Sequence, residues 1–489
     1  MTSGVFPALP IKITRQLAQS QNYIASKHNQ LAGFDNVEQF ALDEKILDEE
    51  VKKVIEFHLI EIRTALASYL WKGGVYIGVS ILDEFVLEAA KSGNSSICDE
   101  VVTNLKSAGV DRSGFVLYPL TEFGLELEIF GDPAGLNSVA IFKEAGFAVA
   151  AQANTQAKAF SNVARMVSEL GITSPVDKSA FLQYAAPSHL KWLTLNPLLL
   201  VKISSHTGDY YENQFIYTLK IRLAAAQVVM LHALSVDAGL PVDKFQSSAD
   251  ISNFETLDIR HYLIGEATKP AQPLNLRRVP MNVSPVDLAR LSDLAVKLST
   301  KTLALPEFQA LEAELAPVLK GIEEGYLRYI NLKSKDGLFV RVYKRLAASI
   351  DWYRQSFGSR TYESEAVVAL AVAFETLLTD HYAPGGAKRI QRRVGICLKG
   401  DPRVEAYKDS VLAIYHARSK IVHTGDAKVE GDIAVAQAAF AKVFLHVASL
   451  LRNLSRGMND PIRELLGDQI TQDEIDAKAI AAAQKNVAT

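Results

Sequence analysis

Arg418 and His423 are the residues of this chain whose types and spacing could carry chemistry. They stand five positions apart within the stretch 415–425, where the sequence predicts that a helix ends near Ser419 and that both side chains converge. An always-charged guanidinium beside an imidazole that titrates near neutral pH can cleave a phosphodiester without a metal ion. The alternative is structural: Arg418 caps helix carbonyls and His423 is a turn residue. The spacing alone is a weak signal.

A run of positive charge just upstream is the second chemical feature. Four cationic residues of a helix predicted over 386–399 lie at three- and four-residue steps and so share one helix face. They are Lys388, Arg389, Arg392 and Arg393. Such a face could follow a phosphate backbone and add affinity without sequence preference. The alternative is a solvated or salt-bridged face, with Glu375 or Glu405 as a partner.

The composition limits the class of protein that positions these residues. A chain of 489 residues with 48% hydrophobic and 22% charged residues is typical of a folded protein of about two to four domains. Its net charge of −3 gives no overall attraction to nucleic acid, so a polyanion site must be a local basic patch.

The two cysteines and the N-terminal sequence indicate where in the cell the protein is located. Cys98 and Cys397 are too few and too isolated for a disulfide framework or a zinc site. We therefore expect no metal, no other cofactor and a reducing, cytoplasmic location. The N-terminus lacks a leader pattern, and charges interrupt the long apolar stretches, so we expect neither secretion nor a membrane span.

Residues 1–267 have the pattern of mixed α and β structure. Apolar residues at three- and four-residue steps predict a helix over 41–70, and alternation predicts a strand within 115–130. Two further strands are predicted over 192–203, with a break at 196–197, and over 256–264. A helix is predicted over 214–234. No chemical constellation stands in this part, so we expect it to be a sensor or regulatory domain.

Four prolines between 267 and 285 mark the main boundary. Residues 268–335 are predicted to form a Pro-rich linker with connecting helices, 336–458 an all-α bundle and 459–489 a polar tail. The expected fold class is therefore α+β. Only helices are expected after the boundary, over 286–303, 306–332, 337–357, 362–382, 386–399, 402–418 and 430–456.

Three segments in order resemble one known family. The helix 365–378 looks like a helix ending in (Ala/Phe)-Leu/Glu-x-Leu-Leu, and 388–394 is similar to the Arg-rich helix that follows it. The stretch 415–425 matches Tyr-x-x-Arg-Ser-x-x-Val-His-x-Gly. These are features of the Apea-like group of the HEPN superfamily, which residues 343–451 therefore resemble. The N-terminal part is not covered.

The resemblance implies an all-α bundle, usually a homodimer or higher homo-oligomer, in which Arg418 and His423 of two protomers form one RNA-cleaving site. It also implies a toxin-like or abortive-infection role in prokaryotic antiphage defence, with a phage-derived trigger or partner protein. An imidazole would take the proton of a ribose 2′-hydroxyl or protonate the leaving 5′-oxygen, and the arginine would stabilise the transition state. The products would carry cyclic phosphate and 5′-hydroxyl ends, and the substrate would be RNA (tRNA, mRNA or rRNA) rather than DNA.

Other residues are expected to support this site. Ser419 stands where catalytic HEPN proteins often have Asn, Asp or His, and it orients an imidazole less strongly than a carboxylate. Glu375 is expected to fix Arg393 or Arg418, with a plain surface salt bridge as the alternative. His416 lies on a different helix face from Arg418 and is expected to be structural or exposed. The predicted RNA-binding residues are Lys388, Arg389, Arg392, Arg393 and Lys420.

Three functions fit the sequence. The first is a metal-independent endoribonuclease that dimerises through its HEPN bundle and is gated by the N-terminal domain. In the second, the HEPN unit is inactive and serves RNA binding or dimerisation. The third is a toxin-like subunit silenced by a separate partner protein.

Overall fold

The structure, a computed structural model, describes most of the chain. The described residues are 6–7, 10–34, 39–40, 48–108, 113–120, 125–126, 138–204, 210–242, 260–267, 272–281, 283–332, 334, 336–358, 361–381, 385–424 and 431–470. Parts of the predicted elements at 41–70, 115–130 and 256–264, together with Gly425 and the tail from 471, lie outside these ranges.

The chain forms two compact units, each built from separate stretches. The first contains Met1–Pro119, Gly146–Lys220 and Asp258–Ser284, and the second contains Leu120–Ala145, Ile221–Leu257 and Pro285–Thr489. Two stretches that the sequence placed in the N-terminal domain thus belong to the second unit. Breaker residues mark where elements end, but they do not reveal which elements pack together.

The N-terminal helices of the first unit enclose an apolar core. They are α1 (Arg15–Ser26), α2 (His28–Leu31), α4 (Glu49–Lys72), α5 (Val79–Lys91) and α6 (Ile97–Ser107). Asp48 caps α4 by accepting a hydrogen bond from the Glu50 amide at 3.1 Å. Ile55, Leu59 and Ile62, at the predicted three- and four-residue steps, are all buried. The predicted helix is therefore confirmed over its described part.

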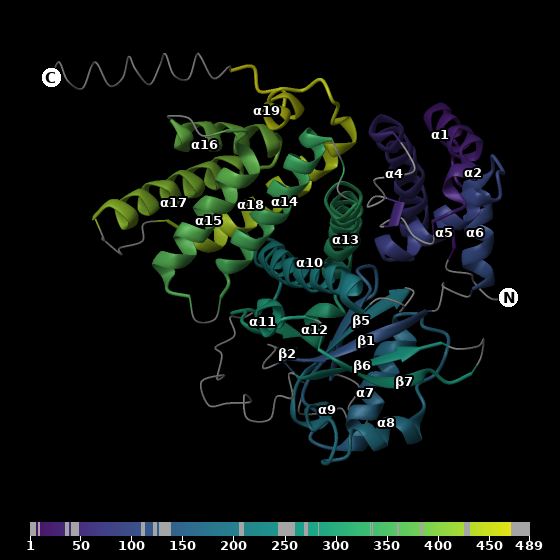
Figure 1. The fold of residues 1–489 in the computed structure, drawn as a ribbon. Helices are drawn as coiled ribbons and strands as arrows, with labels where there is room; N and C mark the ends of the chain where they lie inside the picture. The colour runs from purple at the N-terminus through teal and green to yellow at the C-terminus, as the bar shows by residue number, and fades with distance from the viewer. Residues whose placement is uncertain are drawn as a thin grey trace. The chain divides into compact units, whose positions relative to one another are not determined.

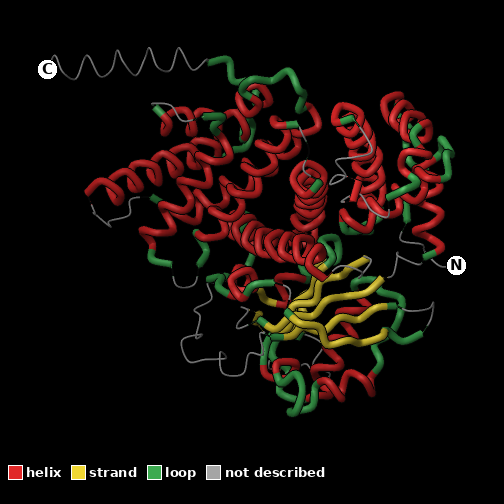
Figure 2. The backbone as a smooth tube through the Cα atoms, viewed as in Figure 1, coloured by secondary structure: helices red, strands yellow, loops and turns green. Residues whose placement is uncertain are grey.

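One six-stranded sheet has the order β3-β4-β5-β1-β6-β7. Its strands are β1 (Ser113–Pro119), β3 (Val139–Phe142), β4 (Phe147–Ala150), β5 (Leu198–Ser204), β6 (His261–Glu266) and β7 (Asn275–Pro280). The pairs β1–β5, β1–β6, β4–β5 and β6–β7 are antiparallel. The accompanying helices are α7 (Gln156–Glu169), α8 (Lys178–Tyr184) and α9 (Trp192–Leu195). In the segment predicted as a strand over 192–203, β5 follows the expected break at 196–197, but the residues before the break form α9 and not a strand. The mixed α and β composition is observed (Figure 2).

Replacing Gly114 by alanine is expected to destabilise this sheet. A Cβ at Gly114 would overlap the backbone carbonyl oxygen of Gly265 on β6, which cannot move without breaking the strand pairing. Overpacking of this kind costs about 1–3 kcal/mol. Thermal unfolding measures the loss, and Gly33→Ala is the matched control because open space surrounds Gly33. Equal melting temperatures for the two variants would contradict the prediction.

The second unit is mainly helical. Its elements are β2 (Leu125–Glu126), the end of α10 (Tyr210–Asp237), α11 (Pro285–Ser292), β8 (Leu298–Ser299), α12 (Thr300–Leu303), α13 (Pro306–Tyr326), the π-helix η2 (Leu327–Asn331), α14 (Gly337–Gln355), α15 (Glu363–Leu378), α16 (Gly386–Cys397), α17 (Val404–Thr424), α18 (Ile433–Leu450), the 3-10 helix η3 (Leu451–Asn453) and α19 (Pro461–Leu465). Six of the seven predicted helices are confirmed. The helix predicted over 286–303 is interrupted, because β8 pairs in parallel with β2.

Helices α14 to α18 form a bundle (Figure 1). Aromatic side chains lie in its core. The rings of Tyr353 and Phe440 stack with centroids 4.3 Å apart, and Phe374 meets Phe440 edge-on at 5.3 Å. The Tyr353 hydroxyl donates a hydrogen bond to the carbonyl oxygen of Gln437 at 3.0 Å. The contact therefore joins α14 to α15 and α18 and fixes the frame on which α17 packs.

Asp237, at the end of α10, fastens that helix to the bundle. Its carboxylate accepts hydrogen bonds from the Tyr407 hydroxyl at 2.7 and 2.8 Å. It also pairs with Arg403 at 2.6 Å and with Lys442 at 2.8 Å. One buried carboxylate thus links α10 to the start of α17 and to α18.

Two helical segments, Phe215–Asp237 and Ile433–Asn453, have the length and apolar composition of a membrane span. In their apolar windows, 78% and 50% of the residues are buried inside the protein. Helices at the centre of a folded core have this same composition. Packing is therefore enough to explain the apolar residues of both segments.

Glu312 on α13 should make stability depend on pH. Burial first, and the nearby charge of Glu144 second, raise the pKa of Glu312 from 4.5 to about 7. Between these values the folded protein binds the proton more tightly than the unfolded chain, so stability falls as pH rises. Glu312→Gln is expected to raise the melting temperature at pH 8 and to leave it unchanged at pH 4. Calorimetry at both values tests this, with Glu314→Gln on the exposed side of the same helix as control.

Candidate functional site

Helix α17 runs without a break through both candidate catalytic residues. It continues to Thr424, so the predicted helix end near Ser419 was wrong. The glycine expected to end the helix is Gly425, and the residues from Ser419 to Thr424 are all compatible with a helix. Five residues of an α-helix turn through about 140° net. Arg418 and His423 therefore point to different sides of α17, and the predicted convergence within one chain does not occur.

The two faces of α17 differ in burial. Its packed face carries Tyr407, Ser410, Val411, Ile414 and Ala417, all buried, with Arg418 half-buried beside them. Its opposite face carries the exposed residues His416, Ser419, Lys420 and His423. The candidate arginine therefore belongs to the inside of the bundle and the candidate histidine to its surface.

Arg418 lies in a group of polar residues that we call the Tyr415 cluster: Glu375 on α15, Arg389 on α16, and Tyr415 and Arg418 on α17. Burial, followed by the neighbouring Glu375 carboxylate, raises the pKa of Tyr415 above its usual value, while Arg418 and Arg389 act in the opposite direction. The Nε of Arg418 is buried and makes no hydrogen bond to any residue that the structure describes. That N–H could therefore serve an anion.

The predicted phosphate track on α16 does not form. Arg389 is 3% exposed, and the side chain of Arg393 is 4% exposed, so neither can follow a nucleic-acid backbone. Arg392 is held by Asp468 at 2.8 Å. Lys388 alone of the four is fully on the surface. Helical spacing could not reveal this, because arginine buries its apolar stem and forms bidentate pairs inside proteins.

Arg393 has partners other than the predicted Glu375. Its Nε lies 2.9 Å from Asp468, its Nη1 lies 3.5 Å from Asp380, and Nη1 donates a hydrogen bond to the carbonyl oxygen of Leu378 at 2.5 Å. We call Asp380, Arg392, Arg393 and Asp468 the C-terminal clasp. Asp468 comes from the segment predicted to be a polar tail, whose described residues 459–470 include the short helix α19 and supply this buried carboxylate.

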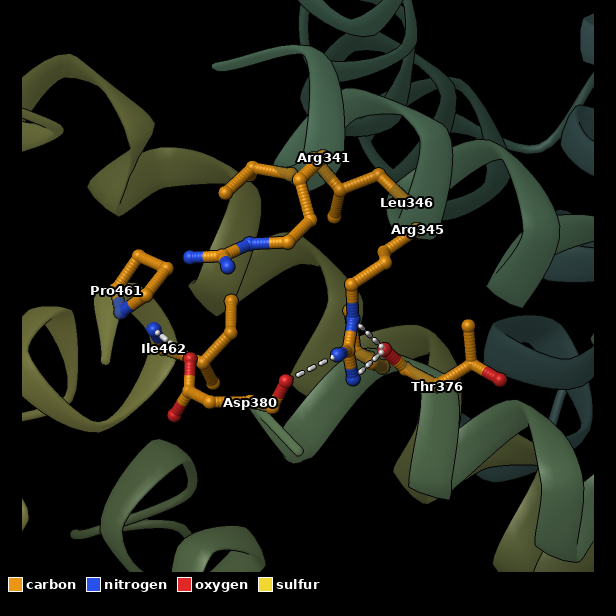
Figure 3. A pocket seen from close by; sticks show the side chains of 9 residues that line it. Arg341, Arg345, Leu346, Thr376, Asp380, Pro461 and Ile462 are labelled. Carbon is orange, nitrogen blue, oxygen red and sulfur yellow. Dashed lines mark hydrogen bonds between the residues drawn. The ribbon is translucent and has the colours of Figure 1, made fainter. Parts of the chain in front are cut away.

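The clasp also organises the start of α19. The Asp380 carboxylate accepts hydrogen bonds from the backbone N–H groups of Ile462 and Arg463, at 2.7 and 3.0 Å. Nearby, the Arg345 guanidinium points at the end of α15 and donates to the carbonyl oxygens of Thr376 and Asp380 (Figure 3). The cavity between these residues measures about 10 Å³, room for roughly one water molecule. This polar region is therefore structural and holds no substrate.

Two larger cavities lie in the second unit. The first, about 1000 Å³, is lined by residues from the end of α10 and the starts of α15 and α18. Among its described lining residues it has Glu363 and Asp432 but no lysine or arginine, so it does not suit a polyanion. The second, about 270 Å³, is lined by Trp352, Val368 and Ile421 among others. Its lining also contains the polar residues Gln355, Ser364 and Glu365, and Val422, the residue after Ile421 on α17, is exposed.

The described residues hold no group of three or more His, Cys, Asp and Glu side chains that could bind a metal ion. Sequence and structure comparisons add no further assignment: no protein family, curated protein or solved structure matches this chain.

Proposed function

We propose that this protein is a metal-independent endoribonuclease of the HEPN type, acting in the cytoplasm in prokaryotic antiphage defence. The observation that carries the proposal is the arrangement of α17. One side holds Arg418 in a charged cluster with an unsatisfied N–H, and the other side presents His423 to solvent. An exposed imidazole can take a proton from a bound RNA or donate one to it.

A second copy of the chain would complete the site. Because Arg418 and His423 lie about 140° apart on one helix, a single chain cannot place both on the same phosphate. Trp352 and Ile421 line the cavity of about 270 Å³, and Val422, next to Ile421 near the end of α17, is 53% exposed. A homodimer that covers these apolar side chains would bring the α17 ends of two protomers together.

The alternative function is a catalytically inactive HEPN module that binds RNA or only dimerises. The burial of Arg389 and Arg393 favours a structural use of the Arg-rich helix, and the half-burial of Arg418 fits that use as well. Under this alternative the exposed face of α17 contributes contacts to RNA but no proton transfer.

Cleavage assays in EDTA separate the two functions. The purified protein is incubated with total RNA, tRNA and a DNA oligonucleotide of matched sequence. We expect RNA fragments with cyclic phosphate and 5′-hydroxyl ends and intact DNA, because only ribose supplies the attacking hydroxyl. RNA that stays intact but is retained by the protein in a filter-binding assay would favour the inactive module.

A further inference from the structure

The exposed face of α17 carries a second histidine, His416. It lies seven positions before His423, which is nearly two helical turns: about 10.5 Å along the axis and about 20° around it. Both side chains are exposed, and neither forms a hydrogen bond or an ion pair with a residue that the structure describes. Ser419 and Lys420 lie between them on the same face. Two unrestrained imidazoles therefore border one strip of helix surface that includes a cation.

We infer that His416 is the second proton carrier of the RNA-cleaving site and acts with His423 of the same chain. This inference rests on the proposed ribonuclease function. It differs from a site in which the histidines of two protomers share the proton transfers. The spacing is suitable because the attacking and leaving oxygens of an in-line displacement lie on opposite sides of the phosphorus, each within hydrogen-bond reach of one imidazole.

The reaction balances with these two groups. One neutral imidazole accepts the proton of the 2′-hydroxyl while the 2′-oxygen forms a bond to phosphorus. The bond from phosphorus to the 5′-oxygen breaks, and the other histidine, as imidazolium, donates a proton to that oxygen. The products are a 2′,3′-cyclic phosphate and a 5′-hydroxyl, with no outside reactant. Lys420 lies where it can stabilise the charge on the non-bridging oxygens.

The charged groups nearest the pair lie on α17 itself and on the helices that pack against its other side. On the same face, Asp409 lies two turns before His416, and further along Glu405 and Lys408 pair with each other at 2.8 Å. Helices α15, α16 and α18 pack on the opposite side of α17, where their charged groups Glu375 and Arg389 belong to the Tyr415 cluster. Within the described residues, no carboxylate pairs with either imidazole.

Single variants test the role of His416. His416→Ala is expected to lower the cleavage rate by about 100-fold or more and to remove one limb of a bell-shaped pH–rate profile. Asp409→Ala, exposed on the same face, is the control and should keep the parent rate and profile. If His416→Ala cleaves like the parent while His423→Ala does not, the inference fails and the proposed ribonuclease function stands.

Mixing the two inactive variants decides whether the pair acts within one chain. After subunit exchange, a dimer of His416→Ala with His423→Ala has no chain with both histidines, so we expect no recovery of cleavage. Recovered activity would place the two histidines on different protomers and overturn the pairing within one chain.

A binding measurement covers the case in which the parent leaves all RNA intact, which would refute the proposed function itself. Uridine 3′-monophosphate is titrated into protein labelled at its histidine rings, and the two variants assign the NMR signals. If His416 and His423 border one phosphate site, both signals shift along one binding curve. A shift of the His423 signal alone overturns the pair.

Discussion

Replacing Asp468 by alanine is expected to cost about 3–5 kcal/mol of folding free energy, because the change leaves the buried guanidinium of Arg393 without its closest carboxylate. The side chains of Asp468 and Arg393 are 2% and 4% exposed, so water cannot take over the lost contact. Asp380 lies 3.5 Å from Arg393 and compensates only in part. Urea unfolding of parent and variant measures the loss.

Two controls make this result specific to the clasp. Glu405→Ala removes an exposed carboxylate paired with Lys408 and should cost about 0–1 kcal/mol. The second control is pH: burial alone would raise the pKa of Asp468, but its hydrogen bonds with Arg392 and Arg393 outweigh burial and lower it. Its stabilisation is therefore present above pH 3.8 and is lost as pH falls through the lowered pKa. A parent-to-variant difference that stays constant to pH 2 would contradict this account.

Replacing His423 by alanine is expected to lower RNA cleavage by about 10²–10⁴-fold, the usual contribution of one general acid or base. Since the side chain is exposed, melting temperature and oligomeric state should not change. Cleavage is followed on a defined RNA in EDTA, with filter binding of the same RNA measured in parallel. A variant that binds and cleaves like the parent would show that His423 carries no proton in the reaction.

His423→Gln serves as the conservative counterpart. Glutamine keeps a polar side chain at this position but cannot exchange a proton near neutral pH. We expect it to be as inactive as alanine. Full activity of the glutamine variant would indicate a contact role rather than acid–base catalysis.

The elements of this fold could be predicted more fully than their packing. Helices α14 to α18 follow from apolar periodicity and from glycines and prolines at their ends. By contrast, Lys388 and Arg392 lie four residues apart on one face of α16, yet Lys388 is exposed and Arg392 is half-buried. Arg392 pairs with Asp468, 76 residues away in sequence. No local sequence pattern predicts a carboxylate partner so far away along the chain.

The candidate site was predictable in residue type but not in orientation. Arg418 and His423 could be selected from their chemistry and spacing, but their relative direction depended on whether α17 stops before or after His423. That choice is a matter of a few residues at a helix end, which is where boundaries are least certain. Glu375 was expected near Arg393 or Arg418, and Glu375 and Arg418 both lie around Tyr415. The part played by Tyr415 could not be predicted, because it has the ordinary pattern of a core residue.

The way the chain threads through its two units limits how this protein can be divided. A fragment that starts at residue 336 retains Arg403, Tyr407 and Lys442 but lacks Asp237, the carboxylate that holds all three. No single cut yields the second unit intact, since it also takes in residues 120–145 and 221–257. Because each unit is built from three separate stretches, no single continuous gene segment encodes one unit alone. A recombination event that replaces one continuous segment therefore cannot exchange one unit and leave the other intact.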